Sequence, residues 1–286
     1  MIQILDGLKE QEKIRHTLLE KVRTLDVKPT LAIILIGNHA PSLIYVARKK
    51  EFAASVGIET KLFHLDTTVS LDYCLTLIQQ LNQDPAIHGI LLQLPVPQTL
   101  DSHQLIQAVD PIKDVDGLHP LNAGKLMQQQ AGLYPCTPQG CLHLIHCWKQ
   151  NLSGLVAVVV GRSNLVGRPI ATLLTHENVT VIQAHSHTKN LKEITRLGDV
   201  LVVAVGKPKF ITKDFVKDGA CVIDVGISKD TEERTVGDVD FESVKNVASA
   251  ISPVPGGVGP MTISYLMMNL MKACCLQLNL VLTLSK

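Results

Sequence analysis

The feature that most constrains this chain is an alternation of short apolar, β-branched runs with longer helix-like segments. Strands that alternate with helices are typical of a parallel sheet covered by helices on both faces. The expected strands are Leu31–Ile36, Gly89–Gln93, Leu155–Val160, Val179–Ala184, Val200–Val205, Cys221–Val225 and Val247–Ile251. The expected helices are Leu8–Leu25, Ser42–Val56, Leu71–Leu81, Pro138–Gln150, Pro169–Glu177 and Thr262–Leu276. We therefore predict an α/β fold.

The 286 residues are enough for two domains, and the runs fall into two groups separated by a stretch rich in Asp, Pro and Gly near Asp110–Pro120. We expect two α/β domains with a cleft between them, the second being a Rossmann-like dinucleotide-binding domain. The final helix is expected to pack back on the first domain. This predicts residues 1–120 plus 264–286 as one domain and 121–263 as the other.

Composition excludes several classes of partner. A net charge of +1 and only 3% aromatic residues argue against nucleic-acid binding. The seven cysteines are odd in number and lack CxxC spacing, so we expect no disulfide framework, no metal site and a reducing cytoplasmic environment. The apolar stretch from Tyr265 to Leu284 contains Asn269, Lys272, Gln277 and Asn279, which favours a buried helix over a membrane span.

The turn after Leu155–Val160 has the residues of a phosphate site. Gly161 ends the apolar run, and Gly167 and Pro169 suit the first turn of a following helix. Free N–H groups and the helix dipole favour an anion at such a position. The spacing is not G-x-G-x-x-G, so a simple strand–turn–helix connector is an equally good interpretation of the glycines alone.

Arg162 favours the phosphate interpretation, because a guanidinium after the turn glycine can pair with a phosphate. An acid after the second strand would select the ribose hydroxyl of NAD. Here that strand ends in A-H-S-H-T without an acid, and Ser186 and His187 suit a 2′-phosphate. The sequence therefore predicts NADP rather than NAD.

The best candidate for proton transfer is Lys49. It lies four residues after Tyr45, so both share one face of a predicted helix, and burial would lower the pKa of the amine. Gln93 ends an apolar strand, where ligands of α/β proteins bind, and could contact Lys49 or substrate. Each residue also has an ordinary interpretation, as a solvated surface lysine or a strand-end hydrogen bond.

Two loops contain further candidates. Asp110, Asp114 and Asp116 lie close together, which could suggest Mg²⁺ or Ca²⁺, but no glutamate closes an EF-hand loop. Asp116 could instead pair with a donor-rich ligand edge or simply form an Asp-Gly turn. The loop Ser252–Thr262 mixes glycines and prolines, which indicates close approach of its backbone to a ligand or a sharp corner.

Six motifs occur in register along nearly the whole chain. They are S-x-x-Y-V-x-x-K at Ser42–Lys49, Q-L-P-x-P at Gln93–Pro97, K-D-V-D-G at Lys113–Gly117, P-C-T-P-x-G at Pro135–Gly140, G-R-S-x-x-V-G-x-P at Gly161–Pro169 and P-V-P-G-G-V-G-P-M-T at Pro253–Thr262. Together they resemble the bifunctional methylenetetrahydrofolate dehydrogenase/cyclohydrolase family of the FolD type.

The resemblance implies a role for each matching residue. It makes Lys49 the catalytic lysine, Gln93 its partner, Tyr45 the ring that stacks on folate and Asp116 the acid that binds the pterin. The implied cofactor-binding residues are Gly161, Arg162, Ser163, Val166, Gly167, Ser186 and Gly206. The implied substrate-binding residues are Tyr45, Lys49, Gln93, Asp116, Pro255, Gly256 and Gly257.

The resemblance also implies the reaction. A folate-binding catalytic domain and an NADP-binding domain would oxidise 5,10-methylenetetrahydrofolate and hydrolyse the methenyl product to 10-formyltetrahydrofolate, in one-carbon metabolism and purine biosynthesis. The resemblance further implies that the protein is a homodimer. The alternatives are a dehydrogenase that has lost hydrolysis, an NADP-binding regulatory protein without turnover, and an unrelated hydroxy-acid dehydrogenase, which the folate motifs disfavour.

Overall fold

The computed structural model describes residues 2–280, and these form two compact units. Unit 1 comprises Pro135–Thr262 and the N-terminal residues up to Gln11; unit 2 comprises Glu12–Tyr134 and the C-terminal residues from Ile263. The helices α1 (Gly7–Arg23) and α10 (Val258–Gln277) each begin in unit 1 and end in unit 2. The cleft expected between two domains stays a prediction.

Residues 121–134 lie in unit 2, whereas the sequence analysis assigned them to the second domain. Two side chains of α10 hold the end of this segment within unit 2. Lys272 Nζ donates to the carbonyl of Gly132 over 2.6 Å, and Asn269 Nδ2 donates to that of Tyr134 over 2.8 Å. The binding roles assigned to the two domains stay predictions.

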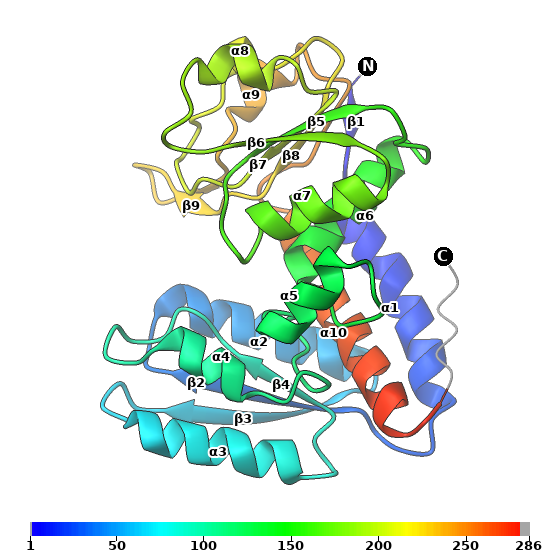
Figure 1. The fold of residues 1–286 in the computed structure, drawn as a ribbon, viewed down its shortest axis with the longest axis vertical. Coiled ribbons are helices and arrows are strands. Elements are labelled where there is room, and N and C mark those ends of the chain that lie inside the picture. Colours follow the sequence, from blue (N-terminus) through cyan, green and yellow to red (C-terminus); the bar gives the residue numbers. More distant parts are fainter. Residues whose placement is uncertain (1, 281–286) are drawn as a thin grey trace. The chain divides into compact units, whose positions relative to one another are not determined.

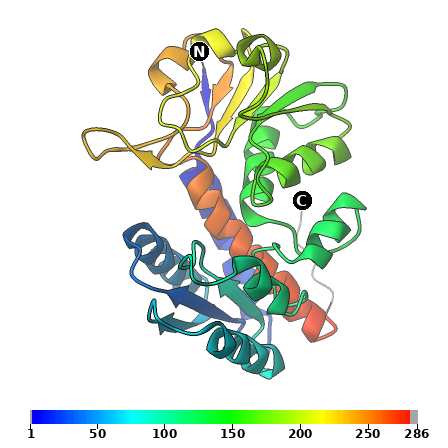
Figure 2. The same cartoon turned by 60° about the vertical axis from the view of Figure 1, so that its left-hand side comes forward.

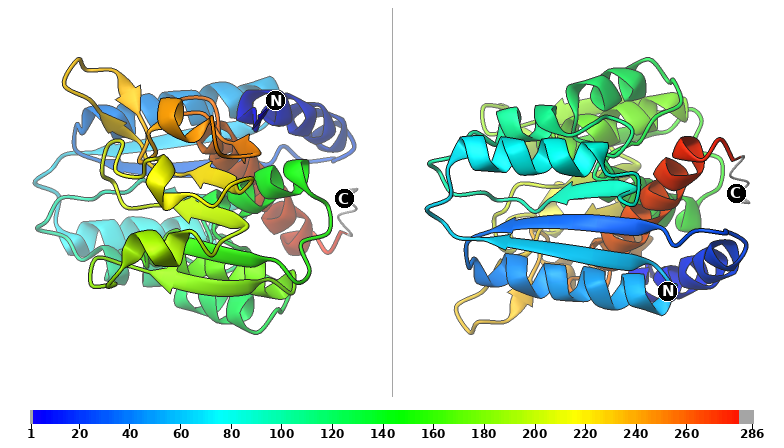
Figure 3. Two further views of the ribbon diagram at one scale, coloured as in Figure 1. Left: turned by 90° about the horizontal axis from the view of Figure 1, so that it is seen from above. Right: turned by 90° about the horizontal axis from the view of Figure 1, so that it is seen from below.

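Unit 2 is built on a three-stranded parallel sheet in the order β3-β2-β4, with β2 at Thr30–Ile36, β3 at Glu59–Leu65 and β4 at Gly89–Leu92. Helices α2 (Ala40–Ser55) and α3 (Leu71–Gln83) cover opposite faces (Figures 1 and 3). All seven residues of β2 are buried, as expected for a central strand with both faces covered.

One strand and two helices of unit 2 were not predicted from the sequence. The residues of β3, E-T-K-L-F-H-L, are all exposed or half-buried, as is common in an edge strand, and they contain no long apolar run. The helices α4 (Ser102–Ala108) and α5 (Pro120–Met127) were also missed, and both are short. Leu105 of α4 lies in the same apolar cluster as Cys74 and Ile78 of α3, so α4 covers the same face of the sheet.

Unit 1 is built on a six-stranded parallel sheet in the order β1-β11-β8-β7-β5-β6. Its strands are β1 (Gln3–Ile4), β5 (Val156–Val160), β6 (Thr180–Ala184), β7 (Val200–Val203), β8 (Cys221–Asp224) and β11 (Ala250–Ile251). Its other elements are α6 (Cys136–Trp148), α7 (Gly167–His176), α8 (Leu191–Thr195), a 3-10 turn (Lys213–Phe215), β9 (Ser228–Lys229), β10 (Thr235–Val236) and α9 (Phe241–Val244).

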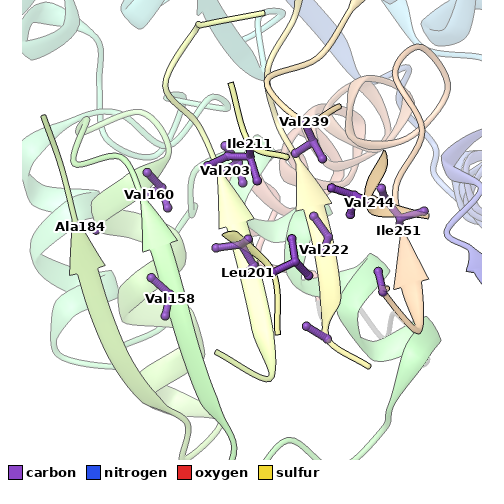
Figure 4. Close-up of a cluster of buried hydrophobic side chains, with 13 residues drawn as sticks. Val158, Val160, Ala184, Leu201, Val203, Ile211, Val222, Val239, Val244 and Ile251 are labelled. Atoms are coloured by element: carbon purple, nitrogen blue, oxygen red, sulfur yellow. The ribbon is translucent and has the colours of Figure 1, made fainter. Parts of the chain in front are cut away.

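Helices again cover both faces of this sheet. Figures 1 and 2 show α6 and α7 on one face and α8 and α9 on the other. On the second face, alternate strand residues such as Val158, Leu201 and Val222 form one buried apolar cluster (Figure 4). The predicted Rossmann-like α/β fold is confirmed for this unit.

The seven predicted strands and six predicted helices all exist, but the last predicted strand is much shorter than expected. Only Ala250–Ile251 of the predicted Val247–Ile251 forms a strand, since Val247 lies in a turn where its N–H donates to Val244. The apolar C-terminal region up to Gln277 belongs to α10, and residues 281–286 lie outside the described residues. No helix within residues 2–280 is long and apolar enough to cross a membrane.

Candidate functional site

In unit 2 the candidate residues gather where the strand order reverses. From β2 the chain continues to β3 on one side and then returns to β4 on the other. The carboxyl ends of β2 and β4 therefore border a topological switch point, which is where open α/β sheets bind ligands. Helix α2 follows β2 and carries Tyr45 and Lys49, while Gln93 directly follows β4.

Lys49 and Gln93 meet at this point, as the sequence analysis expected. Lys49 Nζ donates to Gln93 Oε1 over 2.9 Å, and Gln93 Nε2 donates to the carbonyl of Leu94 over 2.7 Å. Lys49 is only 7% exposed and lies on the inward face of α2 together with Val46 and Phe52. The surface-lysine alternative is therefore wrong, and the amine is held by a neutral amide.

Tyr45 lies one turn before Lys49 on α2 and is half-buried. Burial raises the pKa of its hydroxyl, and the nearby charge of Arg48 opposes that rise. The side chain therefore stays a neutral phenol at neutral pH, with a ring that can pack on a flat ligand and a hydroxyl that can donate.

The three acids of the Asp110–Asp116 motif have different environments. Asp114 is buried, accepts from the backbone N–H of His119 and from Asn122 Nδ2, and burial raises the pKa of its carboxyl. Asp110 accepts from the backbone N–H of Ile112. Asp116 is half-buried, at the turn that closes at Gly117. Asp110 and Asp114 thus shape the loop, and Asp116 stays the acid that the motif predicts to bind the ligand.

In unit 1 the strand order reverses between β5 and β7, because β6 lies on the far side of β5. The turn from β5 into α7 starts at Gly161, which has φ +137°. A Cβ there would lie 2.5 Å from the carbonyl oxygen of Ala204, which follows β7, and a Cβ at Gly167 would lie 2.3 Å from the carbonyl oxygen of Gly161. Only glycine fits this close approach of backbones.

Ser163 holds the shape of this turn. Its Oγ accepts from the N–H of Val166 over 3.1 Å and from that of Gly167 over 3.4 Å. Its carbonyl accepts from the N–H of Arg168 over 3.0 Å. Hydrogen bonds thus join Ser163, Val166 and Gly167 at the start of α7, and their contact with the cofactor stays a prediction.

Arg162 and Ser186 are both exposed, and they follow neighbouring strands, β5 and β6. Beside Ser186, the ring of His187 lies 5.9 Å from that of His185 in an edge-on arrangement. The residues that follow these adjacent strands, Arg162 and Ala184–Thr188, carry a guanidinium, hydroxyls and imidazoles and include no acid. Such donors suit a phosphate monoester.

The loop after β7 depends on an aspartate that the sequence analysis missed. Asp238 is fully buried, and its carboxylate accepts from three consecutive N–H groups, those of Val205, Gly206 and Lys207, over 2.7–2.9 Å. Gly206 has φ +66°, so it takes the left-handed conformation that this loop requires. The sequence offered no motif for Asp238, whose partners precede it by about thirty residues.

A second buried aspartate supports the first. Asp224, at the end of β8, accepts from the N–H groups of Gly226, Asp238 and Val239 over 2.9–3.0 Å. Burial raises the pKa of Asp224 to about 7; its three N–H donors oppose that rise, and the charge of Asp238 adds to it. The two acids together fix the loops at the carboxyl ends of β7 and β8.

The predicted substrate residues Pro255, Gly256 and Gly257 form the loop before α10. Gly256 has φ +102°, and its carbonyl accepts from the N–H of Gly7 over 2.8 Å. A Cβ on Gly7 would lie 1.8 Å from the carbonyl oxygen of Gly257. This loop therefore packs against the start of α1 within unit 1, and its contact with substrate stays a prediction.

Two family models match the chain. Residues 5–116 match the catalytic domain of tetrahydrofolate dehydrogenase/cyclohydrolase, and residues 135–278 match its NAD(P)-binding domain. The first model covers Tyr45, Lys49, Gln93 and Asp116, and the second covers the turn at Gly161.

Individual proteins are similar over nearly their whole length. The bifunctional protein FolD of Streptococcus equi subsp. zooepidemicus is 46% identical over 93% of this chain and 95% of its own. The crystal structure of the bifunctional FolD enzyme from Campylobacter jejuni is 40% identical, with a TM-score of 0.94 over 96% of this chain and 99% of its own. The Trypanosoma brucei FolD structure, complexed with NADP and an inhibitor, is 33% identical, with a TM-score of 0.92 over 97% and 98% of the two chains.

Proposed function

This chain belongs to the tetrahydrofolate dehydrogenase/cyclohydrolase family, and we infer that it is a bifunctional enzyme of one-carbon metabolism. It oxidises 5,10-methylenetetrahydrofolate to 5,10-methenyltetrahydrofolate with reduction of NADP. It then hydrolyses the methenyl compound to 10-formyltetrahydrofolate. The assignment of the site rests mainly on one observation: the buried amine of Lys49 donates a hydrogen bond to the amide oxygen of Gln93.

We propose that Lys49 manages the proton in the hydrolytic step. Water that attacks the methenyl carbon must lose a proton, and a positioned amine can accept it or relay it. Burial disfavours the charged form of an amine, and Gln93 orients Nζ without adding a negative charge that would keep it protonated. Tyr45 and Asp116 are the proposed contacts to the pteridine, as a stacking ring and as a carboxylate that accepts from its amino edge.

The oxidation step places different demands on the protein. Loss of hydride from the methylene carbon leaves a cation that the two flanking folate nitrogens stabilise, so alignment is more important than a protein base. Bound NADP supplies the hydride acceptor.

The residues of unit 1 fit that cofactor. The turn at Gly161 and Gly167 leaves no room for a Cβ, as a backbone that approaches a pyrophosphate requires. Arg162 and Ser186 are proposed to hold the 2′-phosphate, Ser163, Val166 and Gly167 to shape the turn, and Gly206 to form the edge of the cofactor site. Pro255, Gly256 and Gly257 are proposed to approach the substrate through their backbone.

The Lys49→Met variant tests the hydrolytic assignment. Methionine keeps the length and most of the packing of the side chain but cannot carry a proton, so hydrolysis of added methenyltetrahydrofolate should fall about 10²–10⁴-fold. The decay of methenyl absorbance measures the rate, and NADP binding followed by fluorescence reports whether unit 1 is intact. Lys50→Met is the matched control, since Lys50 is the exposed neighbour of Lys49. This variant should hydrolyse methenyltetrahydrofolate at the wild-type rate.

A second variant tests the neutral partner. Gln93→Glu puts a carboxylate beside Nζ, which should keep the amine protonated and move the hydrolytic pH profile to higher pH. Hydrolysis at the wild-type rate in Lys49→Met would remove the lysine from the mechanism. Methenyl compound that accumulates without hydrolysis in the wild type would instead identify a dehydrogenase that has lost its second activity.

We also propose that the enzyme is a cytoplasmic homodimer and that its formyl product serves purine biosynthesis. The seven cysteines all lie within the described residues and are not joined to one another in disulfides, which suits a reducing compartment. Sedimentation equilibrium at micromolar concentration should give twice the chain mass of 31.2 kDa. A mass equal to one chain at that concentration would contradict the dimer.

A further inference from the structure

Three side chains in unit 1 with different ligand atoms converge, and none of them is among the residues assigned to NADP or folate. Glu10 lies in the first turn of α1, and His143 and Cys147 lie on α6. The carboxylate, imidazole and thiol ligand atoms all lie within 4.8 Å of one another. His143 Nε2 is 3.3 Å from Glu10 Oε2. We propose that these three residues form a binding site for a divalent transition metal ion, of which Zn²⁺ is the best fit.

The spacing on α6 supports a metal site. His143 and Cys147 are four residues apart on one continuous helix, so their side chains share a face, as do the two histidines of the helical H-E-x-x-H zinc motif. Glu10 comes from a segment more than a hundred residues away in the chain. No metal site was expected from the sequence because it contains no CxxC pair, whereas this arrangement depends on a single cysteine.

The distances leave room for an ion. Zinc bonds to sulfur, nitrogen and oxygen are about 2.0–2.3 Å long, which separates neighbouring ligands of a tetrahedron by about 3.3–3.8 Å. The separation of His143 from Glu10 already lies in that range, and a rotation about the Cys147 side chain can adjust the third ligand. The His143 and Glu10 side chains are 27% and 13% exposed, so solvent reaches the site and water can supply a fourth ligand.

The choice of ion follows from the donors. Thiolate, imidazole and carboxylate together suit Zn²⁺ or Co²⁺, whereas Mg²⁺ and Ca²⁺ prefer oxygen ligands alone. Cys147 is also the only one of the seven cysteines that is not buried, and all seven lie within the described residues. A metal held there would tie the start of α1 to α6, next to the bond from Gln3 Nε2 to the carbonyl of Cys147. The ion would therefore stabilise the attachment of the N-terminal segment within unit 1.

Cobalt substitution tests this proposal without relying on enzyme activity. One equivalent of Co²⁺ added to the purified, metal-free protein should give a sulfur-to-cobalt charge-transfer absorption and the intense visible bands of a tetrahedral ion. Zn²⁺ should displace it and raise the melting temperature, since an ion that binds only the folded chain stabilises it. Cys147→Ser should abolish the charge-transfer band, and His143→Asn should weaken Co²⁺ binding at least tenfold.

The control variant is His146→Asn, on the same helix and directly before Cys147 in the chain. His146 faces Glu177, 3.6 Å away, so this change should leave the cobalt spectrum unaltered. Circular dichroism of each metal-free variant establishes that the fold is retained. A wild-type spectrum without a charge-transfer band, or a band that persists in Cys147→Ser, would reduce the cluster to an ion pair between Glu10 and His143. Either result leaves the proposed folate chemistry untouched.

Discussion

Burial distinguishes the two cations that the sequence analysis singled out. Lys49 lies on the apolar face of α2, where a charged amine is costly, and its partner is a neutral amide. Arg162 is exposed at the tip of a strand. The same formal charge therefore suits proton transfer at one position and recognition of an anion at the other.

The exposed position of Arg162 leads to a prediction about cofactor choice. Arg162→Ala removes a guanidinium that can pair with the 2′-phosphate, and a charge-assisted bond of that kind corresponds to about 10- to 100-fold in affinity. The dissociation constant of NADP should rise by that factor, while that of NAD should change little. Cofactor fluorescence titration measures both.

Arg168 provides the matched control for Arg162. It lies in the first turn of α7, it is exposed, and its guanidinium donates to Asn164 Oδ1 over 3.0 Å. Arg168→Ala should leave the ratio of the two dissociation constants unchanged. Equal losses for NADP and NAD in Arg162→Ala would show that this arginine does not recognise the 2′-phosphate.

Among the elements, the turn between β5 and α7 has the strictest geometry. Gly161 has φ +137° and faces the carbonyl of Ala204. Gly161→Ala should therefore lower the free energy of unfolding of unit 1 by about 1–3 kcal/mol and weaken NADP binding as well. Urea denaturation followed by circular dichroism measures the first effect, and a cofactor titration measures the second.

Gly124 is the corresponding control. It lies inside α5, and a Cβ there would meet nothing within 4 Å. Gly124→Ala should raise stability by about 0.5–1 kcal/mol, because alanine loses less backbone entropy in a helix. A Gly161→Ala variant as stable as the wild type would show that the turn can relax at little cost.

Elements with a strong apolar period were the predictable ones. The buried strand β2 and the helices α3 and α7 have clear patterns, so the sequence located them within a few residues. The edge strand β3 is polar and half-exposed, and β11 is only two residues long, so their existence and extent depend on the neighbouring strands.

For the stability of the whole molecule, the buried acid pair of unit 1 predicts a dependence on pH. The pKa of Asp224 is raised to about 7, whereas an unfolded aspartate titrates at about 3.9. Folding therefore favours the protonated acid, and this stabilisation is complete below about pH 3.9 and is lost as pH rises to about 7. Between pH 5 and 8 the free energy of unfolding of the wild type should fall by about 2–3 kcal/mol relative to Asp224→Asn.

Urea titrations at several pH values measure that difference. The comparison with Asp224→Asn cancels the contributions of all other titrating groups, which both proteins share. Curves that stay parallel from pH 5 to 8 would mean that Asp224 is already ionised in the folded chain at pH 5.

The amino-acid sequence by itself determined the α/β class, the order of the main elements, the glycine turn after β5 and the residue types of the candidate site. These follow from periodicity and turn chemistry within short windows of the chain. Only the tertiary structure decided that Lys49 is buried against Gln93, 44 residues later, that Asp238 holds the loop at Gly206, and that Glu10 meets His143 and Cys147. Such contacts depend on how distant segments pack, and no local pattern encodes them.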